Sequence, residues 1–237
     1  MSGTDEDKDL LGRTYEYCIQ QFAAYEGTKG GEFYTPQSIV KTIVEVLKPF
    51  DNCRVYDPAC GSGNFLTETY ISLRRLENEV LRGLTNQITM FTDFAPIKVS
   101  IGQFYGIEIN DFAVTVAKTA LWIAESQMMK ETEDILHTDL DFLPLKSYAN
   151  ITEGNALRID WETVVPKDKL NYIMGNPPFV GYKLQTIEQK KDLIPLYKDS
   201  KNIDYVAGWY WKASEFMQGT SIRAALVSTN SITRGDL

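Results

Sequence analysis

Apolar residues are arranged along the chain in two alternating patterns, short continuous runs and longer stretches with a helical repeat. The short runs are typical of buried strands. We expect strands ending at Asp57 and at Ile109, near Ile151, over 170–174 and over 223–228. The longer stretches repeat their apolar positions every three or four residues. They predict helices over 10–25, 36–47, 63–81, 111–128 and 204–217.

This alternation of strands and helices predicts one architecture. Crossovers between successive strands are right-handed, which makes the strands parallel and puts helices on both faces of one sheet. The predicted fold class is therefore α/β, with a doubly wound, mainly parallel, Rossmann-like sheet. Ligands of such sheets bind outside the carboxyl ends of the strands. The stretch 82–103 has no clear period, and we interpret it as an insertion.

Two of the predicted helices have capping residues at their starts. Thr35 followed by Pro36 predicts an N-cap and a first helical residue. Asn110 or Asp111 is expected to cap the helix that follows the second strand. Each cap lies close to a sheet edge where ligands are expected.

The bulk composition is that of a globular protein without a membrane segment. The chain has 237 residues, of which 43% are hydrophobic and 24% charged, and it contains no apolar run near the roughly 18 residues of a membrane span. The acidic start, residues 1–9, lacks the features of a secretory signal. The three cysteines of the chain form no CxxC pair and no even disulfide framework, and this pattern favours a location in the reducing cytoplasm. They are Cys18, Cys53 and Cys60.

The net charge of −8 argues against strong nucleic-acid binding by this chain alone, because duplex affinity depends on neutralising phosphates. One segment, 180–203, is locally richer in lysine. It contains Lys183, Lys190, Lys191, Lys198 and Lys201 against Glu188, Asp192 and Asp199. This pattern fits either a solvated helix face or a local nucleic-acid contact, and the sequence leaves both readings open.

A glycine-rich turn follows the first strand. Residues 57–65 read Asp-Pro-Ala-Cys-Gly-Ser-Gly-Asn-Phe, where Gly61 and Gly63 allow tight backbone geometry beside a ligand. The turn has neither the Lys-Ser/Thr of a P-loop nor the spacing GxGxxG. Glu108 ends the next strand, where a carboxylate can accept both hydroxyls of a ribose. Asn155 follows the third strand in Gly-Asn-Ala-Leu and can contact an adenine edge or serve as a turn residue.

A second motif, Asn-Pro-Pro-Phe at residues 176–179, follows the fourth strand. The side-chain carbonyl of Asn176 and the backbone carbonyl of Pro177 can accept both hydrogens of an amino group. Pro178 stiffens the loop without adding an N–H donor, and Phe179 can stack on a flipped base. The pattern predicts methyl transfer to an exocyclic amine by positioning and hydrogen bonding.

Two other chemistries lack the residues they need. Methylation at C5 of cytosine uses a cysteine that commonly follows proline, and none of the three cysteines does so. Cys60 is interpreted as a small packed residue within the turn. The sole histidine, His137, is interpreted as a surface or loop residue, and no metal site is expected.

In this order, the motifs resemble the S-adenosylmethionine-dependent DNA adenine-N6 methyltransferases of the gamma motif order. The resemblance begins at residues 31–36, where Phe-Tyr-Thr-Pro looks like the family's N-terminal motif, and extends to about residue 236. Residues 154–161, 204–207 and 228–232 are most similar to the methyltransferase region of MmeI-like single-chain restriction–modification enzymes.

The resemblance implies a role for each motif. The backbone at Tyr34 and Thr35 contacts the methionine portion of the cofactor, and Asp57 lies near its amino group. Glu108 binds the ribose, and Asn155, where many relatives carry Asp, lies near the adenine. The implied cofactor-binding residues are Tyr34, Thr35, Asp57, Pro58, Ala59, Gly61, Gly63, Asn64, Glu108, Ile109, Asn155 and Ala156. The implied catalytic residues are Asn176, Pro177, Pro178 and Phe179.

The implied function is methylation of a flipped adenine in double-stranded DNA within a restriction–modification system. Residues 1–30 are expected to form a tail and a helix, and residues 31–237 the S-adenosylmethionine-binding domain. That domain is expected to be incomplete at its C-terminal end, lacking two strands and the target-recognition region that DNA binding requires. In this family an endonuclease segment precedes the domain, but the sequence fixes neither a nuclease nor an oligomeric state.

Two alternatives remain open from the sequence. RNA and protein-glutamine methyltransferases share an Asn-Pro-Pro-aromatic loop on the same kind of sheet. Against them, the Phe-Tyr-Thr-Pro motif and the Asp-Pro-Ala-Cys form of the glycine turn resemble the DNA enzymes. The other alternative is a cofactor-binding fragment that is inactive on its own.

Overall fold

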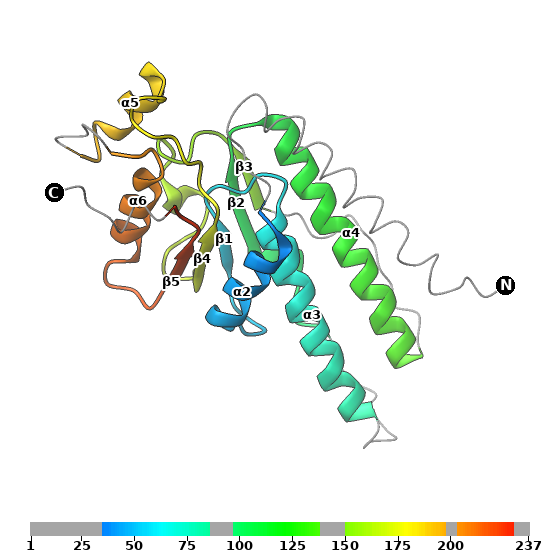
Figure 1. The fold of residues 1–237 in the computed structure, drawn as a ribbon. Helices are drawn as coiled ribbons and strands as arrows, with labels where there is room; N and C mark the ends of the chain where they lie inside the picture. Colours follow the sequence, from blue (N-terminus) through cyan, green and yellow to red (C-terminus); the bar gives the residue numbers. More distant parts are fainter. Residues whose placement is uncertain (1–34, 86–96, 138–149, 198–202, 230–237) are drawn as a thin grey trace.

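The computed structural model describes residues 35–85, 97–137, 150–197 and 203–229 (Figure 1). The described residues form a five-stranded parallel sheet with the strand order β3-β2-β1-β4-β5. Its strands are β1 Val55–Asp57, β2 Phe104–Glu108, β3 Asn150–Glu153, β4 Tyr172–Gly175 and β5 Arg223–Leu226. The order reverses between β1 and β4, which is where doubly wound sheets bind their ligands. The predicted fold class is confirmed.

Helices cover both faces of this sheet (Figure 1). They are α2 Gln37–Leu47, α3 Asn64–Thr85, α4 Asp111–Leu136, α5 Ile187–Leu193 and α6 Ala207–Met217. Two 3-10 turns, η1 Ile101–Gln103 and η2 Trp161–Thr163, precede β2 and follow β3. None of the described helices combines the length and the apolar character needed to cross a membrane.

Two hydrophobic cores lie against the sheet, one on each face. Val55 contributes to the core that α2, α3 and α4 cover, whereas the next residue, Tyr56, belongs to the core under α6 and η2. This alternation follows from the strand repeat of two. Both residues are fully buried, so β1 is the centre of the molecule. The turn that follows Asp57 is therefore anchored to a fully buried central strand.

The strand register brings the ends of the central strands to one edge. Asp57 of β1 pairs with Gly106 of β2, and Tyr56 pairs with Ile173 of β4. Glu108 consequently ends β2 beside the turn that follows β1. The four parallel pairings leave the carboxyl ends of all five described strands at the same edge.

Several predicted boundaries were wrong by a few residues. Thr35 is not an N-cap, because α2 begins at Gln37 with Pro36 in the cap position at ψ 136, which is extended rather than helical. The helix predicted from residue 204 begins at Ala207, since the Asp204 carboxylate accepts hydrogen bonds from backbone N–H groups, including that of Val206. Helix α3 continues past the predicted residue 81 to Thr85.

Other predictions about local structure were confirmed or lie outside the described residues. Asn110 caps α4, with its side-chain oxygen accepting from the N–H groups of Phe112 and Ala113. His137 is exposed after α4, and Cys60 is buried, as expected. The predicted helix at 10–25 and Tyr34 belong to the part of the chain that the structure does not describe.

Candidate active site

The glycine turn links β1 to α3 and is docked onto β2. Gly61 and Gly63 have φ values of 53° and 85°, in the region that favours glycine. A Cβ at Gly63 would lie 3.0 Å from Cβ of Ala117 on α4, so a side chain there would push the helix away. The Cys60 N–H donates to the Ile107 carbonyl at 3.0 Å. The turn is thus fixed against both neighbouring elements.

Glu108 lies under this turn with its carboxylate oriented by two backbone groups. Oε2 accepts from Gly61 N–H at 2.8 Å, and Oε1 accepts from Asn110 N–H at 2.9 Å. The residue is 7% exposed. Each carboxylate oxygen has two lone pairs, so each can accept one further hydrogen bond. The geometry therefore suits a pair of neighbouring hydroxyls, as in a ribose.

Asp57 is fully buried beside the same turn. Its Oδ1 accepts from Ala59 N–H at 2.9 Å, while Oδ2 has no hydrogen-bond partner among the described residues. Burial raises the pKa of this carboxyl to about 8; the Ala59 N–H opposes the rise and the nearby Glu108 charge adds to it. A buried acid with one unmatched oxygen is suited to a cationic ligand group such as an amino group.

Gly175, the last residue of β4, makes room for this carboxylate. A Cβ at this position would lie 2.3 Å from Oδ1 of Asp57. Only a residue without a side chain lets β4 pass so close to the acid. Sequence reasoning missed this requirement, because it arises from a contact between two strands far apart in the chain.

A third turn, residues 154–159, follows β3 and is anchored at several points. Gly154 has φ 147°, and its N–H donates to the Glu108 carbonyl at 2.8 Å. The Ala156 carbonyl accepts from Trp161 Nε1 at 2.9 Å and from Lys212 Nζ at 2.7 Å. Burial lowers the pKa of Lys212 to about 8. The turn is held from both η2 and α6.

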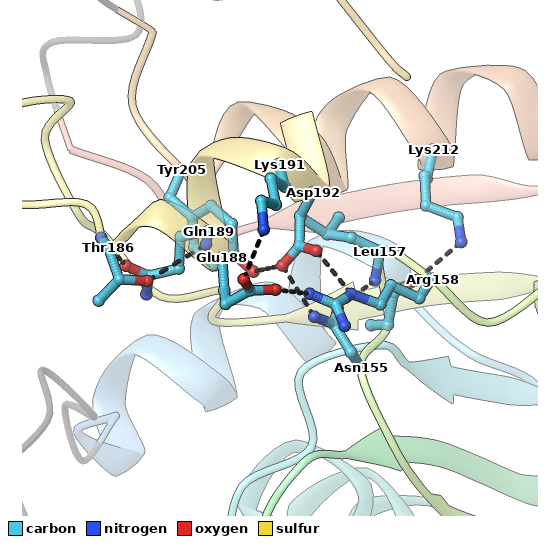
Figure 2. A network of polar contacts seen from close by, with 11 residues as sticks. Asn155, Leu157, Arg158, Thr186, Glu188, Gln189, Lys191, Asp192, Tyr205 and Lys212 are labelled. Atoms are coloured by element: carbon cyan, nitrogen blue, oxygen red, sulfur yellow. Dashed lines mark hydrogen bonds and ion pairs between the residues drawn. The ribbon is translucent and has the colours of Figure 1, made fainter. Parts of the chain in front are cut away.

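Asn155 lies in this turn, directly after Gly154, whose N–H donates to the Glu108 carbonyl. Its Oδ1 accepts from Leu157 N–H at 2.9 Å, and its Nδ2 donates to Oδ2 of Asp192 on α5 at 2.9 Å (Figure 2). Asn155 is thus a turn residue with a further side-chain partner. Its predicted contact with an adenine stays a prediction, and the oxygen retains a lone pair for it.

The second motif continues directly from β4. Asn176 follows Gly175, and its Nδ2 donates to Oγ1 of Thr35 at 3.0 Å. Pro177 is buried, and Phe179 is half-buried. At the far end of the loop, Val180 N–H donates to Asp204 at 3.1 Å. Because β4 is the hydrogen-bonded neighbour of β1, the Asn-Pro-Pro-Phe loop lies at the same sheet edge as the glycine turn.

Trp209 of α6 is a further positioning residue that sequence reasoning missed. Its indole Nε1 donates to the Pro58 carbonyl at 2.8 Å, across 151 residues of sequence, and the side chain is buried. The aromatic richness of residues 204–217 indicated only a packed helix. This hydrogen bond holds the glycine turn from the face opposite α3.

In the described part of the lysine-rich segment, residues 180–197 and 203, the chain forms the short helix α5. On α5, Lys191 pairs with Glu188 at 2.9 Å, and Lys190 lies over the Tyr182 ring at 4.4 Å. Asp192 points inward and is 7% exposed. Among the described residues, no three His, Cys, Asp or Glu side chains are grouped as metal ligands would be.

Comparison with known proteins points to one family. The family model of the MmeI DNA-methyltransferase domain matches residues 34–237. DNA methyltransferase A of Bacillus subtilis is 40% identical over 197 residues, which are 81% of this chain and 22% of that protein. A methylase subunit of the type I restriction enzyme MjaIX of Methanocaldococcus jannaschii is 32% identical over 158 residues, 64% of this chain and 25% of that protein.

Solved structures agree with this assignment. The type IIL restriction–modification enzyme MmeI, solved in complex with DNA, is 38% identical, with a TM-score of 0.73 over 94% of this chain and 30% of that one. A Listeria monocytogenes structure described as a class I S-adenosylmethionine-dependent methyltransferase shares the fold at 12% identity, with a TM-score of 0.53 over 94% of this chain and 55% of that one.

The chain spans about a fifth to a third of the length of the first relatives it matches. The matched family model nevertheless covers nearly all of the described residues. The chain therefore belongs to the family of MmeI DNA-methyltransferase domains, built on the S-adenosylmethionine-dependent methyltransferase fold.

Proposed function

We propose that this chain is the catalytic domain of a restriction–modification enzyme that methylates the N6 amino group of adenine in DNA. One observation carries the proposal. The Asn-Pro-Pro-Phe loop follows β4, the glycine turn follows β1, and Glu108 ends β2, so all three lie at the carboxyl ends of adjacent strands. A cofactor held at the turn would have its reacting end beside a loop suited to bind an amino group.

The residues at the turn fit S-adenosylmethionine in charge and hydrogen bonding. Oδ2 of Asp57 would accept from the amino group of the methionine portion, and Glu108 would accept from the two ribose hydroxyls. Asn155 would lie at the adenine, and the backbone beside Thr35 would border the methionine portion. When bound, the cofactor supplies a methyl group on a sulfonium.

The loop residues would hold the target amine. An adenine amino nitrogen is a poor nucleophile because its lone pair is delocalised into the ring. If Asn176 Oδ1 and the Pro177 carbonyl accept its two hydrogens, the lone pair points out of the ring plane. Thr35 Oγ1 accepts from the Asn176 amide nitrogen, which orients the amide group. Catalysis then consists of positioning and hydrogen bonding.

Double-stranded DNA is the proposed substrate, and the target adenine would be flipped out of the helix to reach the loop. MmeI was solved in complex with DNA, which supports this choice over RNA or protein glutamine. The net charge of −8 leads us to propose that sequence-specific binding needs a target-recognition region outside residues 1–237. We further propose that residues 31–237 are the cofactor-binding domain and that residues 1–30 precede it.

Calorimetric titration with S-adenosylhomocysteine tests the cofactor half of this proposal. We expect micromolar binding that is lost in Glu108→Ala and largely kept in Asn176→Ala, since only the first residue faces the ribose. Absence of binding by a folded chain would overturn the cofactor assignment.

A methyl-transfer assay tests the substrate half. Radiolabelled methyl transfer should be measured with DNA, RNA and protein offered in competition, using a form that includes the target-recognition region. We expect label on adenine N6 of DNA and none with Asn176→Ala. Preferential labelling of RNA or of glutamine side chains would contradict the proposal.

A further inference from the structure

Asp192 on α5 lies at the centre of a polar network (Figure 2). The network joins α5, which follows the Asn-Pro-Pro-Phe loop in sequence, to the turn after β3. Its side chain is 4% exposed. Oδ1 accepts from Arg158 Nε at 2.6 Å, and Oδ2 accepts from Asn155 Nδ2 at 2.9 Å and from Tyr205 OH at 2.8 Å. An acid this buried is stabilised by such donors, and all three come from elements other than α5.

This contact determines which way the Asn155 amide faces. A carboxylate only accepts hydrogen bonds, so the atom 2.9 Å from Asp192 Oδ2 has to be the amide nitrogen. The amide oxygen accepts from the Leu157 N–H at 2.9 Å, which supports the same orientation from the other side. The oxygen is then the polar atom of Asn155 with capacity for a ligand, as it would be in an aspartate.

We propose that Asp192 is a positioning residue that makes Asn155 an acceptor for the amino group of the cofactor's adenine and thereby rejects a 6-oxo purine. The inference rests on the proposed cofactor site. Adenine offers a hydrogen on its 6-amino group, whereas hypoxanthine offers an oxygen at the same place. An amide oxygen held as the acceptor takes a hydrogen bond from the first, whereas with the second it places two acceptors against each other.

The other two donors to Asp192 differ in whether they also contact Asn155. Arg158 is paired with both Asp192 and Glu188, and its side chain is 55% exposed. Tyr205 donates to the same Asp192 oxygen as Asn155 does, so it holds the carboxylate in place from another side. Arg158 donates to Asp192 and Glu188, whereas Tyr205 interacts with both Asp192 and the Asn155 side chain. Arg158 therefore provides the control that weakens the network but leaves the Asn155 amide oriented.

The test compares binding of S-adenosylhomocysteine with binding of S-inosylhomocysteine, its 6-oxo counterpart, to the 237-residue chain by calorimetry. We expect the wild-type chain to prefer the adenosyl form about tenfold, the equivalent of one hydrogen bond lost to a mismatched acceptor. In Asp192→Ala only the Leu157 N–H still orients the amide, so turning the amide to donate to the 6-oxo group costs less and the preference should fall to about twofold or less.

Arg158→Ala is the matched control, because it removes the hydrogen bond to Asp192 Oδ1 and leaves the bond from Asn155 to Oδ2. It should keep the tenfold preference even if both affinities fall. A merely structural role for Asp192 would lower both affinities in Asp192→Ala and leave their ratio at the wild-type value. That result would overturn the proposal.

A second measurement exchanges the two side chains. Asn155→Asp alone places two carboxylates about 3 Å apart in a site that excludes most water, and should weaken adenosyl binding by tenfold or more. Adding Asp192→Asn restores one donor and one acid in reversed positions, and should recover most of the affinity. Additive losses in the double variant would contradict a direct pairing of the residues.

The outcomes separate this inference from the proposed function. A folded wild-type chain that binds neither ligand overturns the cofactor site and, with it, the role of Asp192. A wild-type chain that binds the adenosyl form, but whose preference is the same in Asp192→Ala, keeps the cofactor site and overturns only the role of Asp192. Thermal unfolding of each variant verifies that the chain is folded before titration.

Discussion

The amide nitrogen of Asn176 lies 3.0 Å from the hydroxyl oxygen of Thr35, across 141 residues of sequence. The two residues come from the two ends of the proposed site, one before α2 and one after β4. The hydrogen bond gives Thr35 a function different from the helix cap that the sequence predicted. It sets the orientation of the side chain on which methyl transfer is proposed to depend.

Thr35→Val is expected to lower the rate of methyl transfer more than the affinity for the cofactor. Valine keeps the shape but removes the acceptor, so the Asn176 amide can turn its nitrogen toward the substrate. One neutral hydrogen bond corresponds to about a fivefold to tenfold loss in kcat. Single-turnover transfer and S-adenosylhomocysteine titration measure the two effects separately. Thr35→Ser, which retains the hydroxyl, should stay near wild type; an equal loss in both variants would argue against the hydrogen bond.

Asp57 is expected to release a proton when the cofactor binds. Burial raises its pKa to about 8, so at pH 7 the free protein holds this carboxyl mostly protonated. A cationic amino group at Oδ2 favours the charged form and displaces the proton. Titration of S-adenosylhomocysteine at pH 7 in two buffers of different ionisation enthalpy should therefore show release of most of one proton. In Asp57→Asn the binding enthalpy should be the same in both buffers. Proton release that persists in this variant would assign the proton to another group.

The same pKa predicts a pH dependence of stability. Between the ordinary value of 3.8 and about 8, the folded chain binds more protons at Asp57 than the unfolded chain does. The free energy of unfolding contributed by this group is thus greatest below pH 3.8 and is lost as the pH rises through 8. Urea unfolding of wild type and Asp57→Asn across that interval measures it. The free energy of unfolding of Asp57→Asn, relative to that of wild type, should increase with pH. A difference between the two that stays constant with pH would contradict the prediction.

Trp209→Phe is expected to loosen the glycine turn. The change leaves the buried Pro58 carbonyl without its donor, at a cost of about 1–3 kcal/mol in unfolding free energy. Cofactor affinity should fall with it, because Pro58 lies within the turn. Trp211→Phe on the same helix is the control, since its side chain is 37% exposed and the change should cost about 0.5 kcal/mol or less. Equal effects of the two changes would mean that the indole contact is unimportant.

Gly175→Ala is expected to destabilise the chain by about 1–3 kcal/mol, because the new Cβ would lie 2.3 Å from Oδ1 of Asp57. Gly83→Ala in α3 is the contrasting change, as a Cβ there meets no atom within 4 Å. It should stabilise the helix by up to about 1 kcal/mol. Thermal denaturation of both variants provides the comparison, and a Gly175→Ala chain as stable as wild type would refute the close contact.

The sequence predicted the strands and the place of each motif because these depend on local patterns. The apolar runs fixed β1 to β5 to within a few residues, and the parallel order followed from the crossovers. Glu108 and Asn176 were identifiable because each lies at or just beyond the carboxyl end of a predicted strand, where such folds bind ligands. Asn110 was one of two residues named as the cap of α4 from its neighbours alone.

What the sequence did not predict are contacts between distant segments. The hydrogen bond from Trp209 to Pro58, the space left by Gly175 for Asp57 and the inward turn of Asp192 each require two elements to be placed in space. The lysines around Asp192 left a solvated helix face or a nucleic-acid contact open, and a buried acid among them leaves no periodic signal. The same reason explains the error at Thr35, whose hydroxyl oxygen accepts a hydrogen bond from the distant Asn176 rather than from the adjacent helix.

The parallel pairing of β1 with β4 also bears on how the chain is made. Arg54 N–H, at the start of β1, donates to the side chain of Asn171, 117 positions later. During synthesis, β1, β2 and β3 can therefore pair before β4 has left the ribosome. Until then, the edge of β1 that β4 later covers has no hydrogen-bonded neighbour. Pairings this distant close slowly, and an open strand edge attracts other chains. The strand that brings Asn176 to the site is thus also the one that covers the open edge of β1 in a nascent chain.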